Sequence, residues 1–136
     1  MSQEESKKRR VQVSRTINLY RAEKMALSFL DKSTRLTMIS STKEPVFIWV
    51  SQSWLNYLGW SFEEMTQTPF VEFIHPDDVP SSMEVFKRFQ QTGELGFNGT
   101  FKNRYKCKSG FYKTIVWEQV LQRDDSFYMM EARVDD

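Results

Sequence analysis

The chain has 136 residues, with 19 Lys and Arg against 18 Asp and Glu, one His and one Cys. A chain of this length suits one domain, which buries roughly two-thirds of its unfolded surface on folding. A net charge of +1 gives no global field for a polyanion, so we expect no nucleic-acid partner. A single Cys excludes an internal disulfide, and no Cys/His cluster has the spacing of a zinc site.

The sequence also gives no sign of a membrane location. It lacks the run of about 18 apolar residues that a membrane-spanning helix needs. The basic residues near its start have no apolar segment behind them, unlike those of a secretory signal. We therefore expect a cytoplasmic protein with no membrane partner.

The first third of the chain predicts a tail followed by a helix. Residues 1–12 are polar and include the run KKRR, so we expect a flexible basic tail. Over residues 13–33, apolar residues recur every three or four positions along two adjacent lines, which predicts an amphipathic helix. Either this helix packs only on its own domain, or one line meets the same helix of a second copy. The residues expected in such a homodimer contact are Ile17, Leu19, Tyr20, Ala26, Leu27 and Leu30.

Residues 34–136 are expected to form one α+β domain. Strands are predicted at 35–40 and 46–50, short helical pieces at 51–73, a longer helix at about 78–91, and three further strands at 101–108, 111–121 and 126–134. The last third is the clearest, because apolar and charged residues alternate with a period of two. The order of elements predicts a five-stranded antiparallel sheet with helices inserted between its second and third strands.

Three short segments of this domain resemble, in the correct order, the motifs of the PAS sensor domains. The run LGWSFEEM at 58–65 is similar to the family's "LGYS-x-EEL" segment. The run FIHPDD at 73–78 matches the "IHPDD" signature, and KSGFY at 108–112 resembles the "KDG-x-Y" hairpin. Each motif alone is weak, but together they indicate a PAS fold over about one hundred residues.

The motif residues are expected to have structural roles. Asp78 is predicted to cap the helix that follows it, with its carboxylate accepting hydrogen bonds from unpaired amides. His75 lies beside two Asp residues, but adjacent positions on a turn seldom converge on one ion, so we expect no metal. No nucleophile–base pair or carboxylate pair is apparent, so we expect no enzyme activity. The structural set is Gly59, His75, Pro76, Asp77, Asp78 and Gly110.

The resemblance implies a ligand site between the inner face of the sheet and the short helices. The segment 66–71 lacks the reactive Cys of flavin-binding members, and the predicted long helix lacks the axial His of haem-binding members, so both cofactors are disfavoured. The crowded aromatic interior favours a filled core over a ligand-sized void, leaving open an unknown small molecule or no ligand. The aromatic candidates are Phe47, Trp49, Trp54, Phe70, Phe73, Phe86, Phe89 and Trp117, and the polar candidates are Thr100, Asn103 and Gln119.

The resemblance implies a sensory and signal-transduction module. We expect the N-terminal input domain of a larger signalling protein, such as a two-component sensor histidine kinase or a cyclic-dinucleotide enzyme. Such a module would act on a downstream effector domain or protein partner through a ligand- or partner-dependent change in dimer packing. The alternative is a constitutive protein–protein dimerisation module without a ligand.

Overall fold

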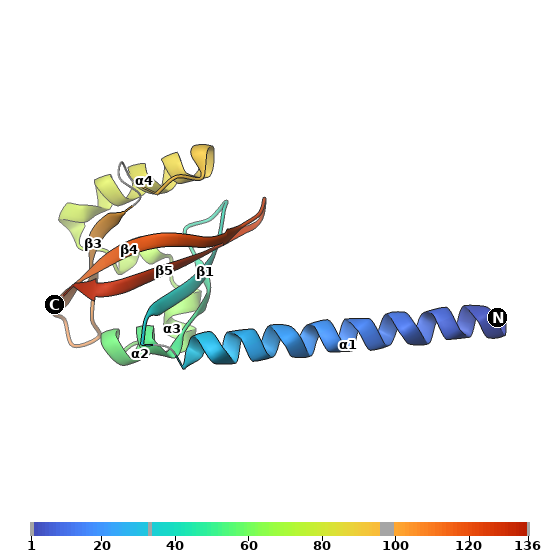
Figure 1. Cartoon of the computed structure of the whole chain (residues 1–136). Helices are drawn as coiled ribbons and strands as arrows, with labels where there is room; N and C mark the ends of the chain where they lie inside the picture. Colours follow the sequence, from blue (N-terminus) through green and yellow to red (C-terminus); the bar gives the residue numbers. More distant parts are fainter. Residues whose placement is uncertain (1, 33, 96–99, 136) are drawn as a thin grey trace. The chain divides into compact units, whose positions relative to one another are not determined.

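The computed structural model describes residues 2–32, 34–95 and 100–135, and for residues 10–20 it describes the backbone only. The chain divides into two units, Met1–Lys32 and Ser33–Asp136 (Figure 1). The first unit contains one helix, and the second contains a sheet with its connecting helices. The candidate site lies in the second unit.

Helix α1 spans Gln3–Asp31 and begins at residue 3 instead of the predicted residue 13. It therefore includes most of the segment that we expected to be a flexible tail. The cause is a local capping signal, in which Ser2 Oγ accepts a hydrogen bond from the Glu5 N–H at 3.1 Å. Glu4 and Glu5 also place negative charge at the positive end of the helix dipole.

The apolar side chains described in α1 are largely exposed. Met25 and Phe29 are 74% and 77% exposed, and their spacing of four residues puts them on one side of the helix. Among the residues expected in a dimer contact, Ala26 is exposed, and Leu27 and Leu30 are half-buried. The other three expected residues fall outside the described side chains, namely Ile17, Leu19 and Tyr20.

Five antiparallel strands form one sheet in the order β2-β1-β5-β4-β3, which confirms the predicted architecture (Figure 1). The strands are β1 (Leu36–Ser41), β2 (Phe47–Val50), β3 (Phe101–Lys106), β4 (Tyr112–Arg123) and β5 (Phe127–Asp135). Along β5, the side chains of Tyr128, Met130 and Ala132 are buried while those between them are not. This alternation shows that one face of the sheet is covered.

Helical segments lie within residues 52–92, between β2 and β3, as predicted. They are α2 (Gln52–Leu58), α3 (Phe62–Gln67), the 3₁₀ turns η1 (Phe70–Glu72) and η2 (Pro76–Asp78), and α4 (Val79–Thr92). Gly59 ends α2 with a φ of 84°, and its N–H donates to Leu55 O at 2.8 Å. A Cβ at this position would lie 3.5 Å from Lys108 Cβ, an ordinary contact, so the left-handed backbone rather than lack of space favours glycine.

The FIHPDD segment lies along the edge strand β3. The His75 N–H donates to Arg104 O at 2.9 Å, and the Lys106 N–H donates to Phe73 O at 2.7 Å. These bonds pair part of the open edge of β3 that would otherwise be free to bind another strand. Gly110, in the turn that leads from β3 to β4, has a φ of 100°.

The expectation that Asp78 caps α4 is wrong. Its side chain makes no capping bond; instead it accepts from Arg104 N, Nε and Nη2 at 2.8 to 2.9 Å. Asp78 has an α-helical backbone because η2 leads directly into α4, so the usual extended cap conformation is absent. The capping role at this turn belongs to His75, whose Nδ1 accepts from the Asp77 N–H at 3.1 Å.

We expect Asp78→Asn to lower the free energy of unfolding at pH 7 by about 1–2 kcal/mol, since solvent still reaches the ion pair. Hydrogen bonds from Arg104 lower the pKa of Asp78 from 3.8 to about 2. A lowered pKa stabilises the fold above the unfolded-state pKa, and this contribution is lost as the pH falls from about 4 to about 2. Urea titrations at pH 7 and pH 3 measure the difference between wild type and variant.

The difference should shrink by about half at pH 3, because the wild-type carboxylate is then partly protonated in the unfolded chain. Asp125→Asn is the matched control, since Asp125 is exposed. We expect it to change stability by less than about 0.5 kcal/mol at either pH. A difference for Asp78→Asn that is equal at both pH values would contradict this role.

Candidate functional site

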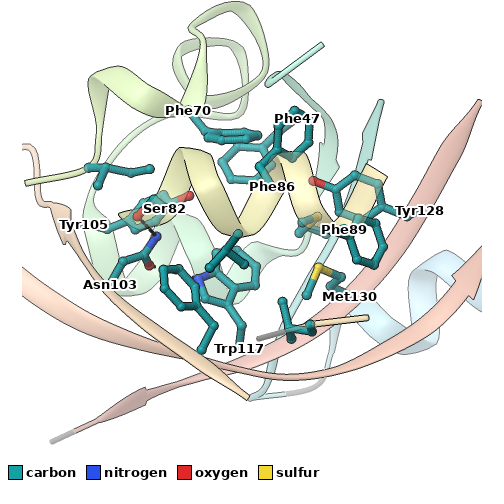
Figure 2. Close-up of a pocket in the computed structure, with 15 residues that line it drawn as sticks. Phe47, Phe70, Ser82, Phe86, Phe89, Asn103, Tyr105, Trp117, Tyr128 and Met130 are labelled. Carbon is teal, nitrogen blue, oxygen red and sulfur yellow. Dashed lines mark hydrogen bonds between the residues drawn. The ribbon is translucent and has the colours of Figure 1, made fainter. Parts of the chain in front are cut away.

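A cavity of about 60 Å³ lies in the second unit, between α4 and the covered face of the sheet (Figure 2). Its wall is mostly aromatic and aliphatic, with a few hydroxyl and amide groups. The residues lining it are Met38, Phe47, Phe70, Ile74, Ser82, Val85, Phe86, Phe89, Leu95, Phe101, Asn103, Tyr105, Trp117, Tyr128 and Met130. None of these described residues carries a charged side chain.

The size of the cavity limits what it holds without rearrangement. One buried water needs about 10–15 Å³, and a protein cavity that binds benzene has about 150 Å³. A volume of about 60 Å³ therefore admits a few waters or an organic molecule of a few heavy atoms. A larger ligand would require movement of the aromatic wall.

A buried polar relay joins three elements at the cavity wall. Trp117 Nε1 on β4 donates to Asn103 Oδ1 on β3 at 2.9 Å, and Asn103 Nδ2 donates to Ser82 Oγ on α4 at 3.1 Å. The indole nitrogen can only donate, so it fixes which side of the Asn103 amide faces β4. All three residues are buried, and the relay couples the position of α4 to the sheet.

Two buried tyrosines also line the cavity, and both are neutral donors at physiological pH. Burial raises the pKa of Tyr105 well above its usual value of 10, and the nearby Tyr128 raises it further. Burial raises the pKa of Tyr128 to about 12, an effect that a hydrogen bond with the Ser40 side chain partly opposes. The site therefore offers hydrogen bonds without charge.

Trp54 supports this wall from behind. It is fully buried, and its ring centroid lies 5.8 Å from that of Phe47, 5.7 Å from that of Tyr105 and 5.4 Å from that of Trp117. Its Nε1 donates to Thr37 O at 3.1 Å, which anchors α2 to β1. Trp54 thus holds three cavity-lining rings in place without lining the cavity itself.

Six of the eleven candidate ligand-site residues line the cavity, namely Phe47, Phe70, Phe86, Phe89, Asn103 and Trp117. Trp54 and Phe73 are buried beside it, and Thr100 is exposed where the chain enters β3. Trp49 is paired with Ile39, which follows the cavity residue Met38 and so faces the opposite side of the sheet.

Gln119 is exposed and donates to Glu131 Oε1 at 3.1 Å on the outer face of the sheet. Strict alternation would give it the same face as Trp117. A shift in the β4–β5 register between these two residues breaks that alternation. The irregular register of β4 therefore accounts for the misplacement of Gln119.

Several lining residues were not among the predicted site residues. Tyr105 shares a face with Asn103 on β3, and Tyr128 and Met130 share a face on β5, so period-two alternation could have found them. Ser82 gave no such signal, because a lone serine in an amphipathic helix is usually exposed. Ser82 is buried, and its hydroxyl accepts a hydrogen bond from Asn103.

Comparison with known proteins identifies the family. The model of the PAS fold matches residues 47–130, and the chain belongs to this family. The sequence has no match among the curated proteins with which it was compared. The structural similarities below, all under 25% identity, support the fold.

The PAS domain of a two-component sensor histidine kinase is 16% identical with a TM-score of 0.63, over 84% of this chain and 96% of that chain. The PAS domain of the RpfR quorum-sensing receptor from Cronobacter turicensis, in complex with C12:0, is 11% identical with a TM-score of 0.63. The match covers 77% of this chain and 97% of that chain. The PAS-B domain of Cycle from Drosophila melanogaster, with bound ethylene glycol, is 20% identical with a TM-score of 0.58. The match covers 74% of this chain and 99% of that chain.

Two further observations concern the described part of the chain. No helix there has the length and apolar character needed to cross a membrane. Within the same residues, no group of three or more His, Cys, Asp or Glu side chains is placed to hold a metal ion.

Proposed function

We propose that this PAS domain is the sensory input module of a larger cytoplasmic signalling protein, such as a sensor histidine kinase or a cyclic-dinucleotide enzyme. In this role it has no catalytic activity of its own, and it passes a signal to a downstream effector domain or partner. The observation that carries the proposal is the uncharged cavity between α4 and the sheet, crossed by the Ser82–Asn103–Trp117 relay. Similar PAS domains from a sensor histidine kinase and a quorum-sensing receptor support it by analogy of fold.

The proposed signal route begins at the cavity wall. Met38 of β1 lines the cavity, so an occupant would contact this strand directly. Only residues 32–35 separate α1 from β1 along the chain. A ligand changes the packing of a dimer formed through α1 only if it binds one packing more tightly than the other.

The proposed dimer contact uses the apolar side of α1 against a second copy of the same helix. Met25 and Phe29 are exposed large apolar residues on this helix, and burying them would be favourable. We expect Phe29→Glu to weaken dimerisation at least tenfold, because the contact would then bury two like charges. Sedimentation velocity over a range of protein concentrations measures the change.

Phe111→Glu is the matched control, because Phe111 is 78% exposed in the turn before β4 and is outside the proposed contact. We expect this variant to dimerise like the wild type. Equal dimerisation of the Phe29 and Phe111 variants would refute the α1 contact. A wild type that stays monomeric at high concentration would refute the dimer itself.

The second candidate function is a constitutive dimerisation module without a ligand. The dense aromatic wall favours it, since the free volume is only about 60 Å³. The two functions differ in one measurable respect. In the sensory module, occupancy of the cavity changes the dimer dissociation constant, whereas in the constitutive module it does not.

A further inference from the structure

The Tyr105 hydroxyl is an unpaired donor inside the cavity. Among the described residues, no hydrogen bond reaches this hydroxyl, although the residue is only 2% exposed. Every fully enclosed side-chain nitrogen or oxygen in the described residues has a partner. The Tyr105 oxygen must therefore keep some accessible surface, and that surface lies in the cavity that the residue lines.

The other polar groups of the cavity differ from Tyr105 in having partners. The Tyr128 hydroxyl is paired with the Ser40 side chain, and it lies opposite Tyr105 across the cavity (Figure 2). Asn103 is paired on both sides of its amide by the relay. A buried donor without a partner costs free energy, and an occupant that accepts from it would recover this cost.

The Tyr105 ring is held rigidly, so its hydroxyl has a defined position. Its centroid lies 5.7 Å from that of Trp54 and 6.0 Å from that of Trp117, and it stacks on Phe73 at 6.5 Å with an angle of 11° between the rings. A donor fixed by its neighbours loses little conformational freedom when it binds. This arrangement suits a specific polar contact rather than a chance gap in the core.

The wall also determines the charge of the occupant. No charged side chain is among the described lining residues, so a bound carboxylate or ammonium would be buried without a counter-ion. Hydrogen-bond donors and apolar groups together suit a molecule that has an oxygen acceptor and a short apolar part.

We propose that Tyr105 is the polar anchor of the cavity and that the cavity takes a small uncharged organic molecule that presents an oxygen acceptor to the Tyr105 hydroxyl. This inference rests on the proposed sensory function and names the ligand class of the same site. The size of about 60 Å³ suits an amide, ketone or alcohol of a few heavy atoms.

The test uses the whole chain and two probes of nearly equal shape, neutral propionamide and anionic propionate, at pH 7. The NMR signal of the Trp117 indole N–H reports binding, because this group lies in the cavity wall. Propionamide is expected to shift the signal in a saturable manner, and propionate is not. Tyr105→Phe should weaken propionamide binding three- to tenfold, the effect of one lost hydrogen bond.

Tyr57→Phe is the matched control, since Tyr57 lies on α2, is 36% exposed and is not among the residues lining the cavity, and we expect less than a twofold change in binding. Thermal melts without probe give an independent readout: Tyr105→Phe should melt no lower than wild type, because no protein hydrogen bond is lost. Equal propionamide affinity in wild type and Tyr105→Phe would refute the anchor while leaving the sensory function standing. Equal binding of propionate would refute the ligand class, and absence of binding by either probe would refute a ligand-binding cavity of this kind.

Discussion

Replacing Trp54 with alanine is expected to lower the free energy of unfolding by about 3–5 kcal/mol, the usual cost of removing a buried Trp or Phe ring. The side chain is fully buried, and its indole contacts the rings of Phe47, Tyr105 and Trp117. Its bond to Thr37 O would be lost as well. Since a domain of this size has a total stability of about 5–15 kcal/mol, this loss would remove a large fraction of it.

Urea titration followed by circular dichroism measures this effect, and Trp49→Ala is its control. Trp49 has the same side chain, but it is half-buried on the other face of the sheet. We expect Trp49→Ala to cost less than half as much, because its ring leaves a smaller cavity. A Trp54 variant as stable as the Trp49 variant would show that the aromatic cluster does not support the cavity wall.

Asn103→Leu is expected to cost about 2–4 kcal/mol, although leucine has the same number and branching of side-chain heavy atoms as asparagine. The change leaves the Trp117 Nε1–H and the Ser82 hydroxyl buried without their partner. Unsatisfied buried groups cost more than the hydrogen bonds themselves contribute. Differential scanning calorimetry should show a fall in Tm of about 10 °C or more.

A double variant separates the lost relay from a simple packing defect. The double variant Asn103→Leu with Trp117→Phe removes the stranded indole donor. Its loss of unfolding free energy should therefore be smaller than the sum of the losses in the two single variants. Asn56→Leu is the control, since Asn56 is exposed on α2 and pairs only with Gln52 Nε2 in the described contacts. Full additivity of the two core substitutions would contradict the relay.

The sheet could be predicted from the sequence because its signals are local. Alternation along 101–108 and 126–134 reports which side chains face the core, and the FIHPDD run marks the junction between the short helices and α4. The left-handed end of α2 at Gly59 was likewise readable from one residue type. The family match over residues 47–130 agrees with this interpretation.

The errors arose where partners are distant in the sequence. Asp78 was expected to bond the helix beside it, but it binds Arg104, which lies 26 residues away on β3. Gln119 was expected in the pocket, but the irregular β4–β5 register turns it outward. Local patterns contain no information on such contacts or on the register of neighbouring strands.

The candidate site was predictable in outline only. Aromatic composition indicated which rings surround the interior, but the free volume depends on how these rings pack, which no pattern in the sequence reports. The relay needs Ser82 and Trp117 to approach Asn103 from opposite sides. The unpaired state of Tyr105 follows only from the positions of all its neighbours.

Native mass spectrometry of the intact chain tests the central claim most directly, because it reports bound mass and stoichiometry in one spectrum. The sensory function predicts a dimer that carries an additional mass, lost when the protein is denatured. The value of that mass should correspond to a small uncharged molecule. If the mass per subunit under native conditions equals that of the denatured polypeptide, both with and without added propionamide, a ligand-binding role for the cavity would be contradicted.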